Sequence, residues 1–381
     1  MRDNGMWKLR RRVREAVLRE QMIPKGGTVL LGLSGGADSV CLLGILASLR
    51  EELRFTLYAM HVQHGIRGEE ALRDMRFSEE MAERFAVPFF TETVDAPALA
   101  KEQGLGLEEA ARILRYRALR EKLASLTGSG QDAPAGRIAV AHHLDDQAET
   151  VVHHLVRGSG LRGLGGMAAE NISVIRPLLS VRRRDILEAL TESRVPYVTD
   201  STNLDPAYTR NRIRNEILPA LETLNPQAVQ HIASAAQQMA EADRYFRELA
   251  EQLVSGQVEA LPPGCMALRP FQEEADSGVS GEASLRGIRI SVKALQDMPQ
   301  IVRRYVMMEL VRRTGTPEKD WTSRHYTELE QLPGRQGGAH LDLPGQLTAE
   351  YRGGWLWLLK RPEVLSVRRK EKDRKKQDRG T

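Results

Sequence analysis

Short apolar runs alternate with helical patterns through the first 200 residues, and this alternation constrains the fold more than any other feature of the chain. The apolar runs, typical of buried strands, occupy residues 28–33, 55–62, 88–95, 137–143, 172–178 and 195–200. Helical periodicity occupies residues 7–21, 40–53, 71–86, 107–124, 145–157 and 181–193. Such alternation produces βαβ units, so we expect an α/β fold with a doubly wound, mostly parallel sheet and helices on both faces.

The pattern changes after Arg210 and predicts a second, smaller domain. A long helical run extends to about Val254, residues 273–287 are polar and loop-like, and residues 297–331 are again helical in pattern. Short strands with turns follow in a final structured segment. We therefore expect domains over residues 1–218 and 219–362, the second largely helical, and a basic, disordered tail over residues 363–381.

Composition excludes several classes of protein. The net charge of +4 and pI near 9.0 suit a polyanionic partner, although weakly. Cys41 and Cys265 are the two cysteines, too few and too distant in sequence for a disulfide framework or a zinc site, which favours a reducing, cytoplasmic location. The basic N-terminus has no apolar core of a signal peptide, and no run of about 18 apolar residues predicts a membrane helix.

The sharpest motif is the run Ser34, Gly35, Gly36, Ala37, Asp38 and Ser39, between a predicted strand and a predicted helix. Consecutive glycines and a helix N-terminus let backbone N–H groups approach an anion. No Gly-Lys-[Ser/Thr] follows, so this is not a Walker A loop. It resembles the PP-loop, SGGxDS, of N-type ATP pyrophosphatases, which implies ATP binding and, at Asp38, Mg²⁺. The alternative is a capped Gly-Gly turn.

Carboxylates follow the fourth predicted strand, in the segment HHLDDQAET. Asp145 and Glu149 share a helix face, and Asp146 and Glu149 also fit a capping box, which is the structural alternative. Because this segment follows a strand of the same sheet as the glycine loop, we expect the carboxylates to bind Mg²⁺ or to act as a general base. Asp38 and Asp146 are the predicted metal ligands.

Other polar segments carry weaker signals. His61 and Arg67 follow the second strand, where adenine or ribose contacts arise in doubly wound sheets, although the same loop could be structural. Glu108, Arg112 and Arg115 lie at helical spacing and form either an ion-paired surface or a clamp for phosphate or carboxylate.

Two further loops concern nucleic acid and nucleotide binding. The polar loop DSTN at 200–203 leads into the basic stretch that contains Arg210 and Arg212, which suits nucleic-acid phosphates or a solvated surface. The match to G-x-G-x-x-G at residues 158–163 follows a predicted helix rather than a strand, so we reject a Rossmann interpretation.

Taken in order, these motifs resemble the tRNA(Ile)-lysidine synthetase family. The resemblance rests on SGGADS, MHVQHGIRG, EEAARILRY, AHHLDDQAETVVHHLVRGSGLRGLGGM and DSTN…TRNRIRNEILP, and covers residues 25–220 closely. The LDLPG segment at 341–345 resembles the family's second domain more loosely. Longer members carry a third domain, whereas here a basic tail follows LDLPG, and Gln63 stands where the family more often has Asn or Asp.

The resemblance implies a two-step ligase reaction with ATP and Mg²⁺. The C2 oxygen of the wobble cytidine of tRNA(Ile) with a CAU anticodon would attack the ATP α-phosphate. The lysine ε-amine would then displace AMP and form lysidine. It assigns ATP binding to Ser34–Ser39 and metal or base roles to Asp38, Asp145, Asp146 and Glu149. Anion contacts fall to Arg112, Arg115, Arg210 and Arg212.

The expected partners are tRNA(Ile) and L-lysine, and no association with a membrane is expected. The second domain would bind tRNA. A homodimer is left open. The alternatives are another PP-loop tRNA-modifying enzyme, such as a thiolase, or a non-catalytic tRNA-binding module. A C-x-x-C pair typical of thiolases is absent from the sequence, and the intact SGGADS motif disfavours loss of catalysis.

Overall fold

A computed structural model describes residues 5–65, 69–128, 135–171, 173–199, 209–260, 286–317, 320–335 and 339–360. It divides into two compact units, Met1–Glu241 and Ala242–Thr381. Arg67, Cys265, the DSTN loop and the basic tail lie outside the described residues, so the expectations for them stay predictions.

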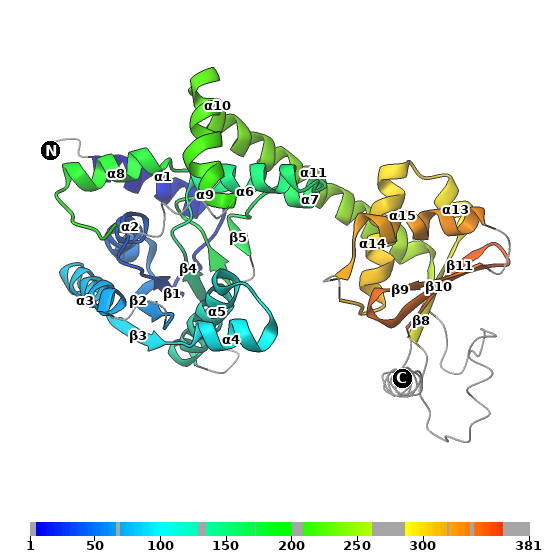
Figure 1. Ribbon diagram of the computed structural model, residues 1–381, viewed down its shortest axis with the longest axis horizontal. Coiled ribbons are helices and arrows are strands. Elements are labelled where there is room, and N and C mark those ends of the chain that lie inside the picture. Colours follow the sequence, from blue (N-terminus) through cyan, green and yellow to red (C-terminus); the bar gives the residue numbers. More distant parts are fainter. Residues whose placement is uncertain are drawn as a thin grey trace, which may run out of the picture. The chain divides into compact units, whose positions relative to one another are not determined.

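The first unit is built on a six-stranded sheet (Figure 1). Its strands are β1 (Thr28–Gly32), β2 (Thr56–Gln63), β3 (Phe89–Thr93), β4 (Gly136–Ala139), β5 (Glu170–Asn171) and β6 (Val174–Ile175). The order is β3-β2-β1-β4-β6-β5, parallel except for β5. The chain winds outward in both directions from β1 and β4, so the expected doubly wound α/β fold is confirmed. Ligands bind such sheets at the carboxyl ends of the strands beside this reversal.

Helices cover both faces of the sheet. They are α1 (Gly5–Arg19), α2 (Ala37–Leu53), α3 (Glu69–Arg84), α4 (Ala96–Gln103), α5 (Leu107–Thr127), α6 (Leu144–Val156), α7 (Leu161–Leu164) and α8 (Arg183–Glu192). Residues of α1, α2, α3 and α8 pack in one large apolar cluster, whereas α5 packs in another on the opposite face. Helix α2 is apolar nearly all round, and ten of its residues are buried. Such a helix has no stable position except inside a core.

The predicted strand at 195–200 is much reduced. Within residues 195–199, only Val198 pairs, in a single parallel bridge to Gly36. Gly36 belongs to the glycine loop, and a loop that turns sharply into α2 offers a partner at one position only. The apolar run 195–198 therefore supports that loop rather than extending the sheet.

The first unit continues past the predicted boundary at residue 218. Helix α9 (Thr209–Arg212), the π-helical turn Ile213–Ile217, α10 (Leu218–Leu224) and the start of α11 (Ala228–Gln257) follow. Ile213, Leu218 and Val229 pack against Ala148 of α6. This shared apolar cluster explains why the split falls later, at Glu241, inside α11.

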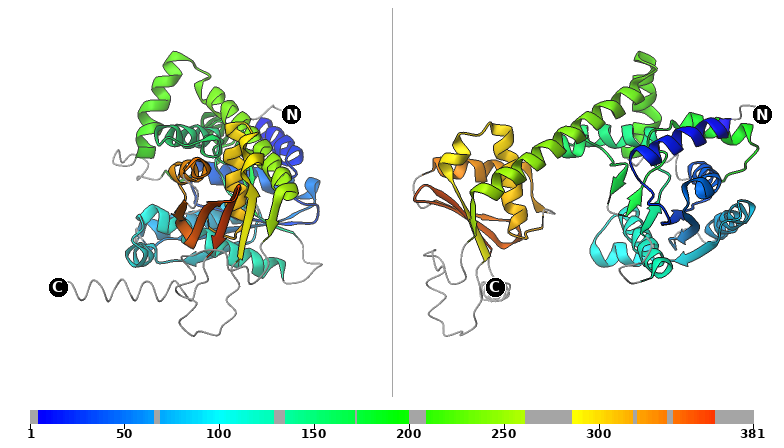
Figure 2. Two further views of the ribbon diagram at one scale, coloured as in Figure 1. Left: turned by 90° about the vertical axis from the view of Figure 1, so that its right-hand side faces the viewer. Right: turned by 180° about the vertical axis from the view of Figure 1, so that it is seen from behind.

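The second unit contains a five-stranded antiparallel sheet of order β7-β8-β11-β10-β9 (Figure 2). Its strands are β7 (Val258–Ala260), β8 (Arg286–Ser291), β9 (His340–Leu343), β10 (Leu347–Arg352) and β11 (Trp355–Lys360). Its helices are α13 (Val292–Gln296), α14 (Gln300–Arg313) and α15 (Ser323–Gln331), with 3-10 turns at Leu332–Gly334 and Pro344–Gln346.

This unit therefore contains more strand than a largely helical domain would. Leu356 and Leu358 of β11 alternate with half-buried tryptophans, and these two leucines enter a core shared with Val306 and Leu310 of α14. Strand β8 begins within the segment 273–287 that the sequence predicts to be loop-like. Arg286, Gly287 and Arg289 dilute the apolar pattern by which a strand could be recognised. Among the described residues, no helix is both long and apolar enough to cross a membrane.

Candidate active site

The glycine loop connects β1 to the N-terminus of α2, as the sequence predicts. Hydroxyl groups hold its shape: Ser34 Oγ lies 3.1 Å from Ser39 Oγ, which donates to the Gly36 carbonyl at 2.9 Å. Helix α2 has Gly36 as its N-cap and no side chain that caps its first N–H groups. A 17-residue helix with an uncapped N-terminus presents partial positive charge to an anion.

Gly35 and His61 hold the loop against its neighbours. Gly35 has φ +83°, and a Cβ there would lie 3.1 Å from Ser78 Oγ of α3, so glycine is required on both counts. His61 is buried, and its Nδ1–H donates to the Leu33 carbonyl at 2.9 Å, directly before the loop. His61 thus contacts the strand end that leads into the loop.

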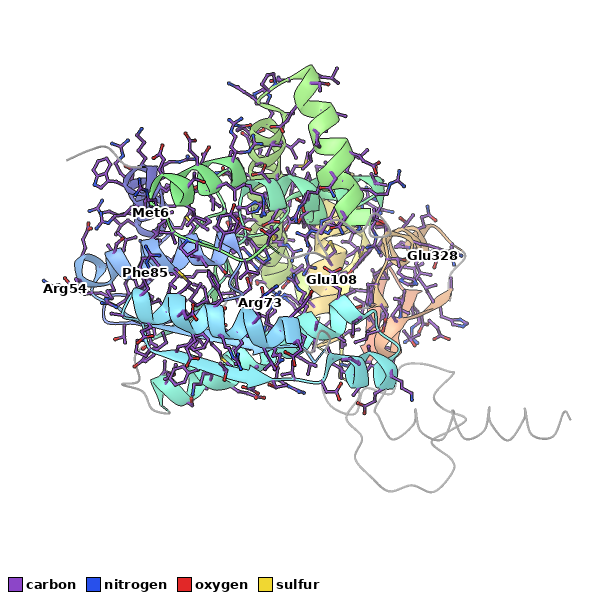
Figure 3. All side chains as sticks on the ribbon, turned by 60° about the vertical axis from the view of Figure 1, so that its left-hand side comes forward. Met6, Arg54, Arg73, Phe85, Glu108 and Glu328 are labelled. Atoms are coloured by element: carbon purple, nitrogen blue, oxygen red, sulfur yellow. The ribbon has the colours of Figure 1, made fainter. Side chains whose placement is uncertain are left out.

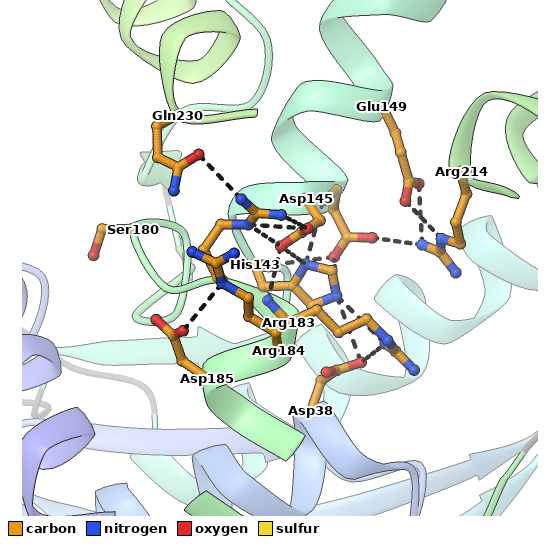
Figure 4. Close-up of polar contacts among 12 residues, drawn as sticks. Asp38, His143, Asp145, Glu149, Ser180, Arg183, Arg184, Asp185, Arg214 and Gln230 are labelled. Carbon is orange, nitrogen blue, oxygen red and sulfur yellow. Dashed lines mark hydrogen bonds and ion pairs between the residues drawn. The ribbon is translucent and has the colours of Figure 1, made fainter. Parts of the chain in front are cut away.

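Asp38, in the first turn of α2, faces the start of α6 and α8. Its Oδ2 accepts a hydrogen bond from Arg183 Nη1 at 2.6 Å and lies 3.7 Å from His143 Nε2 (Figure 4). Its Oδ1 is buried and has no hydrogen-bond partner among the described residues. A carboxylate oxygen that is buried without a partner is costly, which is typical of a position completed by a ligand.

The start of α6 is organised by a capping box between His143 and Asp146. The Asp146 N–H donates to His143 Nδ1 at 3.2 Å, and the His143 N–H donates to Asp146 Oδ2 at 3.0 Å. The capping box expected as an alternative therefore exists, but its N-cap is His143, and Glu149 has no part in it.

Asp145 and its arginine partners join α6 to α8 and to the helices that follow. Its carboxylate accepts from Arg182 Nε at 3.1 Å and from the Arg183 backbone N–H at 2.7 Å. Arg182 also donates to Glu222 of α10 and Gln230 of α11. Both Asp145 oxygens are therefore engaged by a buried guanidinium and a helix N-terminus, which is a structural arrangement.

Glu149 and Asp146 share one arginine. Arg214 Nε donates to Glu149 Oε1 at 2.6 Å, and its Nη2 donates to Asp146 Oδ1 at 2.8 Å. Arg210 Nε adds a contact to Glu149 Oε2 at 3.2 Å. Burial opposes the charge of Asp146, but His143, His142 and Arg214 outweigh it and lower its pKa. We call Asp38, Asp145, Asp146 and Glu149, with their arginines, the acidic cluster.

A second group of charges lies at the carboxyl ends of β4 and β6, and we call it the arginine cluster: Arg112, Arg115, His142 and Arg176. Arg176 is 7% exposed, and its Nη1 donates to the Ala168 carbonyl at 2.7 Å. The guanidinium carbons of Arg112 and Arg115 lie 5.3 and 5.5 Å from the Tyr116 ring centre.

Three nitrogens of the arginine cluster are buried without a hydrogen-bond partner among the described residues: Arg115 Nε, His142 Nδ1 and Arg176 Nε. Burial lowers the pKa of His142 to about 3, and the three arginines outweigh the opposite effect of Asp146. Burial and Arg112 also lower the pKa of Arg115 and of Arg176. The cluster is thus an electropositive site with little compensating negative charge.

The remaining predicted residues lie on the surface. Glu108, labelled in Figure 3, is exposed in the first turn of α5. Arg212 pairs with Glu216 at 3.5 Å, and both side chains are more than half exposed. Among the described residues, no three His, Cys, Asp or Glu side chains form a ready metal-binding group.

Comparison with known proteins agrees with this geometry. A PP-loop domain model matches residues 8–221, which contain both clusters. The tRNA(Ile)-lysidine synthase of Dehalococcoides mccartyi is 31% identical over 364 residues, 91% of this chain and 70% of that protein. The chain belongs to the tRNA(Ile)-lysidine synthase family.

Other members of the lysidine synthase family match as well. The protein of Parabacteroides distasonis is 42% identical over 240 residues, and that of Caldanaerobacter subterraneus is 32% identical over 343 residues. These matches cover 63% and 89% of this chain. The chain spans about half the length of the first of these relatives (52%) and 66% of the second.

A solved structure supports the fold of this chain. A U34-tRNA thiolase from Methanococcus maripaludis, solved with its [4Fe-4S] cluster, aligns with a TM-score of 0.52 at 17% identity. The alignment covers 62% of this chain and 80% of the thiolase, and at this identity it concerns the fold alone.

The sequence did not indicate which residues pair with the carboxylates of the candidate site. Arg182, Arg183 and Arg214 were not singled out as ligands of carboxylates, because they lie 37 to 145 residues from them along the chain. His142 and Arg176 were missed too. Arg176 directly follows β6, so the rule that places ligands at the carboxyl ends of parallel strands could have found it.

Proposed function

We propose that the chain is a tRNA(Ile)-lysidine synthase, a ligase that forms a C–N bond on tRNA in the cytoplasm. The C2 oxygen of the wobble cytidine in a CAU anticodon attacks the α-phosphate of ATP, and diphosphate leaves. The ε-amine of L-lysine then attacks C2, AMP leaves and lysidine forms. Family membership supports this reaction, because the matched relatives are named for it.

The loop Ser34–Ser39 would bind the phosphates of ATP. Its uncapped helix N-terminus and its glycines suit an anion that is approached by backbone N–H groups. His61 would act by positioning this loop through Leu33, and Arg67 would contact the nucleotide.

Asp38 fits a Mg²⁺ ion through its partnerless buried Oδ1, which is the observation that best supports catalysis here. When bound, the ion would neutralise phosphate charge. Asp146 was the second predicted ligand, but both its oxygens are engaged by Arg214 and the His143 N–H. The base for the lysine ammonium would then be Glu149 or Asp146, after Arg214 moves, and Asp145 would keep its partners in place.

RNA would be bound through exposed cations. Arg210 and Arg212 lie on α9, with side chains 37% and 63% exposed, and both can reach phosphates from the surface. Glu108 and Arg112 would contact substrate from the start of α5. Residues 242–360 would supply further tRNA contacts.

The test is incorporation of radiolabelled lysine into a transcript of tRNA(Ile) with a CAU anticodon, with ATP and Mg²⁺. Asp38→Ala is expected to lower the rate at least about 100-fold, because charge stabilisation at such sites is worth that much. Asp185→Ala is the matched control, since Asp185 pairs with Arg12 of α1 and not with a residue of the loop, and its rate is expected to stay within about twofold of the wild type.

Two outcomes would contradict this proposal. If wild-type protein binds ATP but labels no transcript, the reaction uses another nucleophile or another RNA, as a thiolase would. If Asp38→Ala remains active, the loop does not act through this carboxylate. Light scattering of the purified chain would test the homodimer left open by the sequence.

A further inference from the structure

Among the described residues, no carboxylate forms an ion pair with the arginine cluster, which distinguishes it from the acidic cluster. Asp146 and Glu108 are the carboxylates that act on it. Asp146 already accepts from Arg214 and from the His143 N–H, and Glu108 is exposed. Buried cations without a counter-ion are rare because the desolvation of their charge is not compensated. The cluster is therefore built for a negative group that the described residues do not supply.

Its position is that of a ligand site. His142 follows β4, and Arg176 follows β6 on the adjacent strand, so both lie at the carboxyl edge of the sheet. His142 is one residue before His143, which lies 3.7 Å from Asp38. The cluster thus adjoins the acidic cluster, and together they offer a positive and a negative region to one ligand.

The burial of these groups restricts the kind of anion. Arg176 is 7% exposed, so it suits the terminal group of a small molecule better than the backbone of a polymer. Phosphates of ATP already have the N-terminus of α2, and RNA phosphates have the exposed Arg210 and Arg212. A planar guanidinium matches a carboxylate by two parallel hydrogen bonds.

We propose that Arg115 and Arg176, assisted by His142, bind the α-carboxylate of the amino-acid substrate, so that its amine extends toward the acidic cluster. This inference rests on the proposed function, because it takes L-lysine as the amino acid. Arg176 and His142 then have substrate-binding roles, and Arg115 binds a carboxylate rather than a phosphate. The two clusters would then select ligands that have a negative group at one end and a cation at the other.

The experiment compares L-lysine with L-lysinamide, in which the carboxylate is replaced by a neutral amide. Binding of each is measured by calorimetry on the full chain with Mg²⁺ and α,β-methylene-ATP, which cannot be cleaved between those phosphates. Wild-type protein is expected to bind lysine about 10- to 100-fold more tightly than lysinamide, the range for a charge-assisted pair.

Arg176→Met is expected to weaken lysine binding by the same factor and to leave lysinamide binding unchanged. Arg115→Met should behave alike, and Arg176→Lys should recover part of the preference. The matched control is Arg117→Met, an exposed arginine on the same helix as Arg115, which should keep the full preference. Binding of the ATP analogue and thermal unfolding verify that each variant is folded.

Three results would overturn the inference. The wild type could bind both ligands equally, or Arg176→Met could keep the preference for lysine. Arg176→Met could also weaken the nucleotide or the tRNA transcript instead, which would make the cluster a phosphate site. In these cases lysidine formation by the wild type would still support the proposed function. Wild-type protein that neither binds lysine nor labels the transcript would refute both.

Discussion

Two groups of buried charges lie at the carboxyl edge of one sheet, and they differ in whether the chain supplies the opposite charge. In the acidic cluster, Asp145, Asp146 and Glu149 all have an arginine within 3.1 Å. In the arginine cluster, three buried nitrogens have no partner among the described residues. The paired charges join helix α6 to α8 and to the π-helical turn Ile213–Ile217, and they stabilise the fold. The unpaired nitrogens are expected to lower the stability of the fold, as groups in binding sites commonly do.

Of the changes that test this contrast, Glu149→Gln is expected to have the largest effect on stability. The side chain of Glu149 is 1% exposed and faces Arg214 and Arg210, so the change removes the buried negative charge and leaves one neutral amide oxygen as acceptor for two cations. We expect the free energy of unfolding to fall by about 2–3 kcal/mol, less than for a fully buried pair because Arg214 is 26% exposed. Urea unfolding measures it.

The control for that change is Glu216→Gln. Glu216 pairs with Arg212, but both side chains are more than half exposed, so the expected loss is below about 0.5 kcal/mol. Equal losses for the two variants would show that burial does not separate the acidic cluster from an ordinary surface pair.

An intermediate effect on stability is expected from the protonation of His142 as pH falls. The folded pKa of His142 is about 3, below the usual 6.5, so the unfolded chain takes up a proton that the folded chain does not. Stability is therefore full above pH 6.5 and declines as pH falls toward 3, by about 1 kcal/mol per pH unit. Wild type and His142→Gln should differ by this slope in unfolding experiments at pH 6 and pH 4. Parallel profiles would show that burial and the three arginines do not disfavour the charged imidazole.

The smallest effect is expected from Arg115→Met, and its sign is opposite to that of Glu149→Gln. Removing a cation whose buried Nε has no hydrogen-bond partner among the described residues should raise the free energy of unfolding by about 1 kcal/mol in the absence of ligand. Arg117→Met, on the exposed side of α5, should change it by less than about 0.5 kcal/mol. A marked loss of stability in Arg115→Met would mean that the arginine cluster is compensated after all.

Much of this fold could be predicted, because strands and helices of the first unit differ in periodicity and are separated by Gly and Pro. The glycine loop and the α6 carboxylates could be placed on one sheet edge by topology alone. The boundary at Glu241 could not, since a continuous helix such as α11 has no sequence signal where its packing partners change. Side-chain pairing was equally inaccessible: Arg183 reaches Asp38 across 145 residues, and nothing local to either residue records that contact.

The capping box of α6 has a consequence for where a proton lies. Because His143 Nδ1 accepts from the Asp146 N–H, a neutral His143 ring must carry its hydrogen on Nε2. That Nε2 lies 3.5 Å from Asp146 Oδ2 and 3.7 Å from Asp38 Oδ2. The hydrogen bonding of a helix end thus favours one tautomer, whose Nε2–H lies between the carboxylates of Asp38 and Asp146. Nitrogen NMR of the His143 ring would observe this tautomer directly.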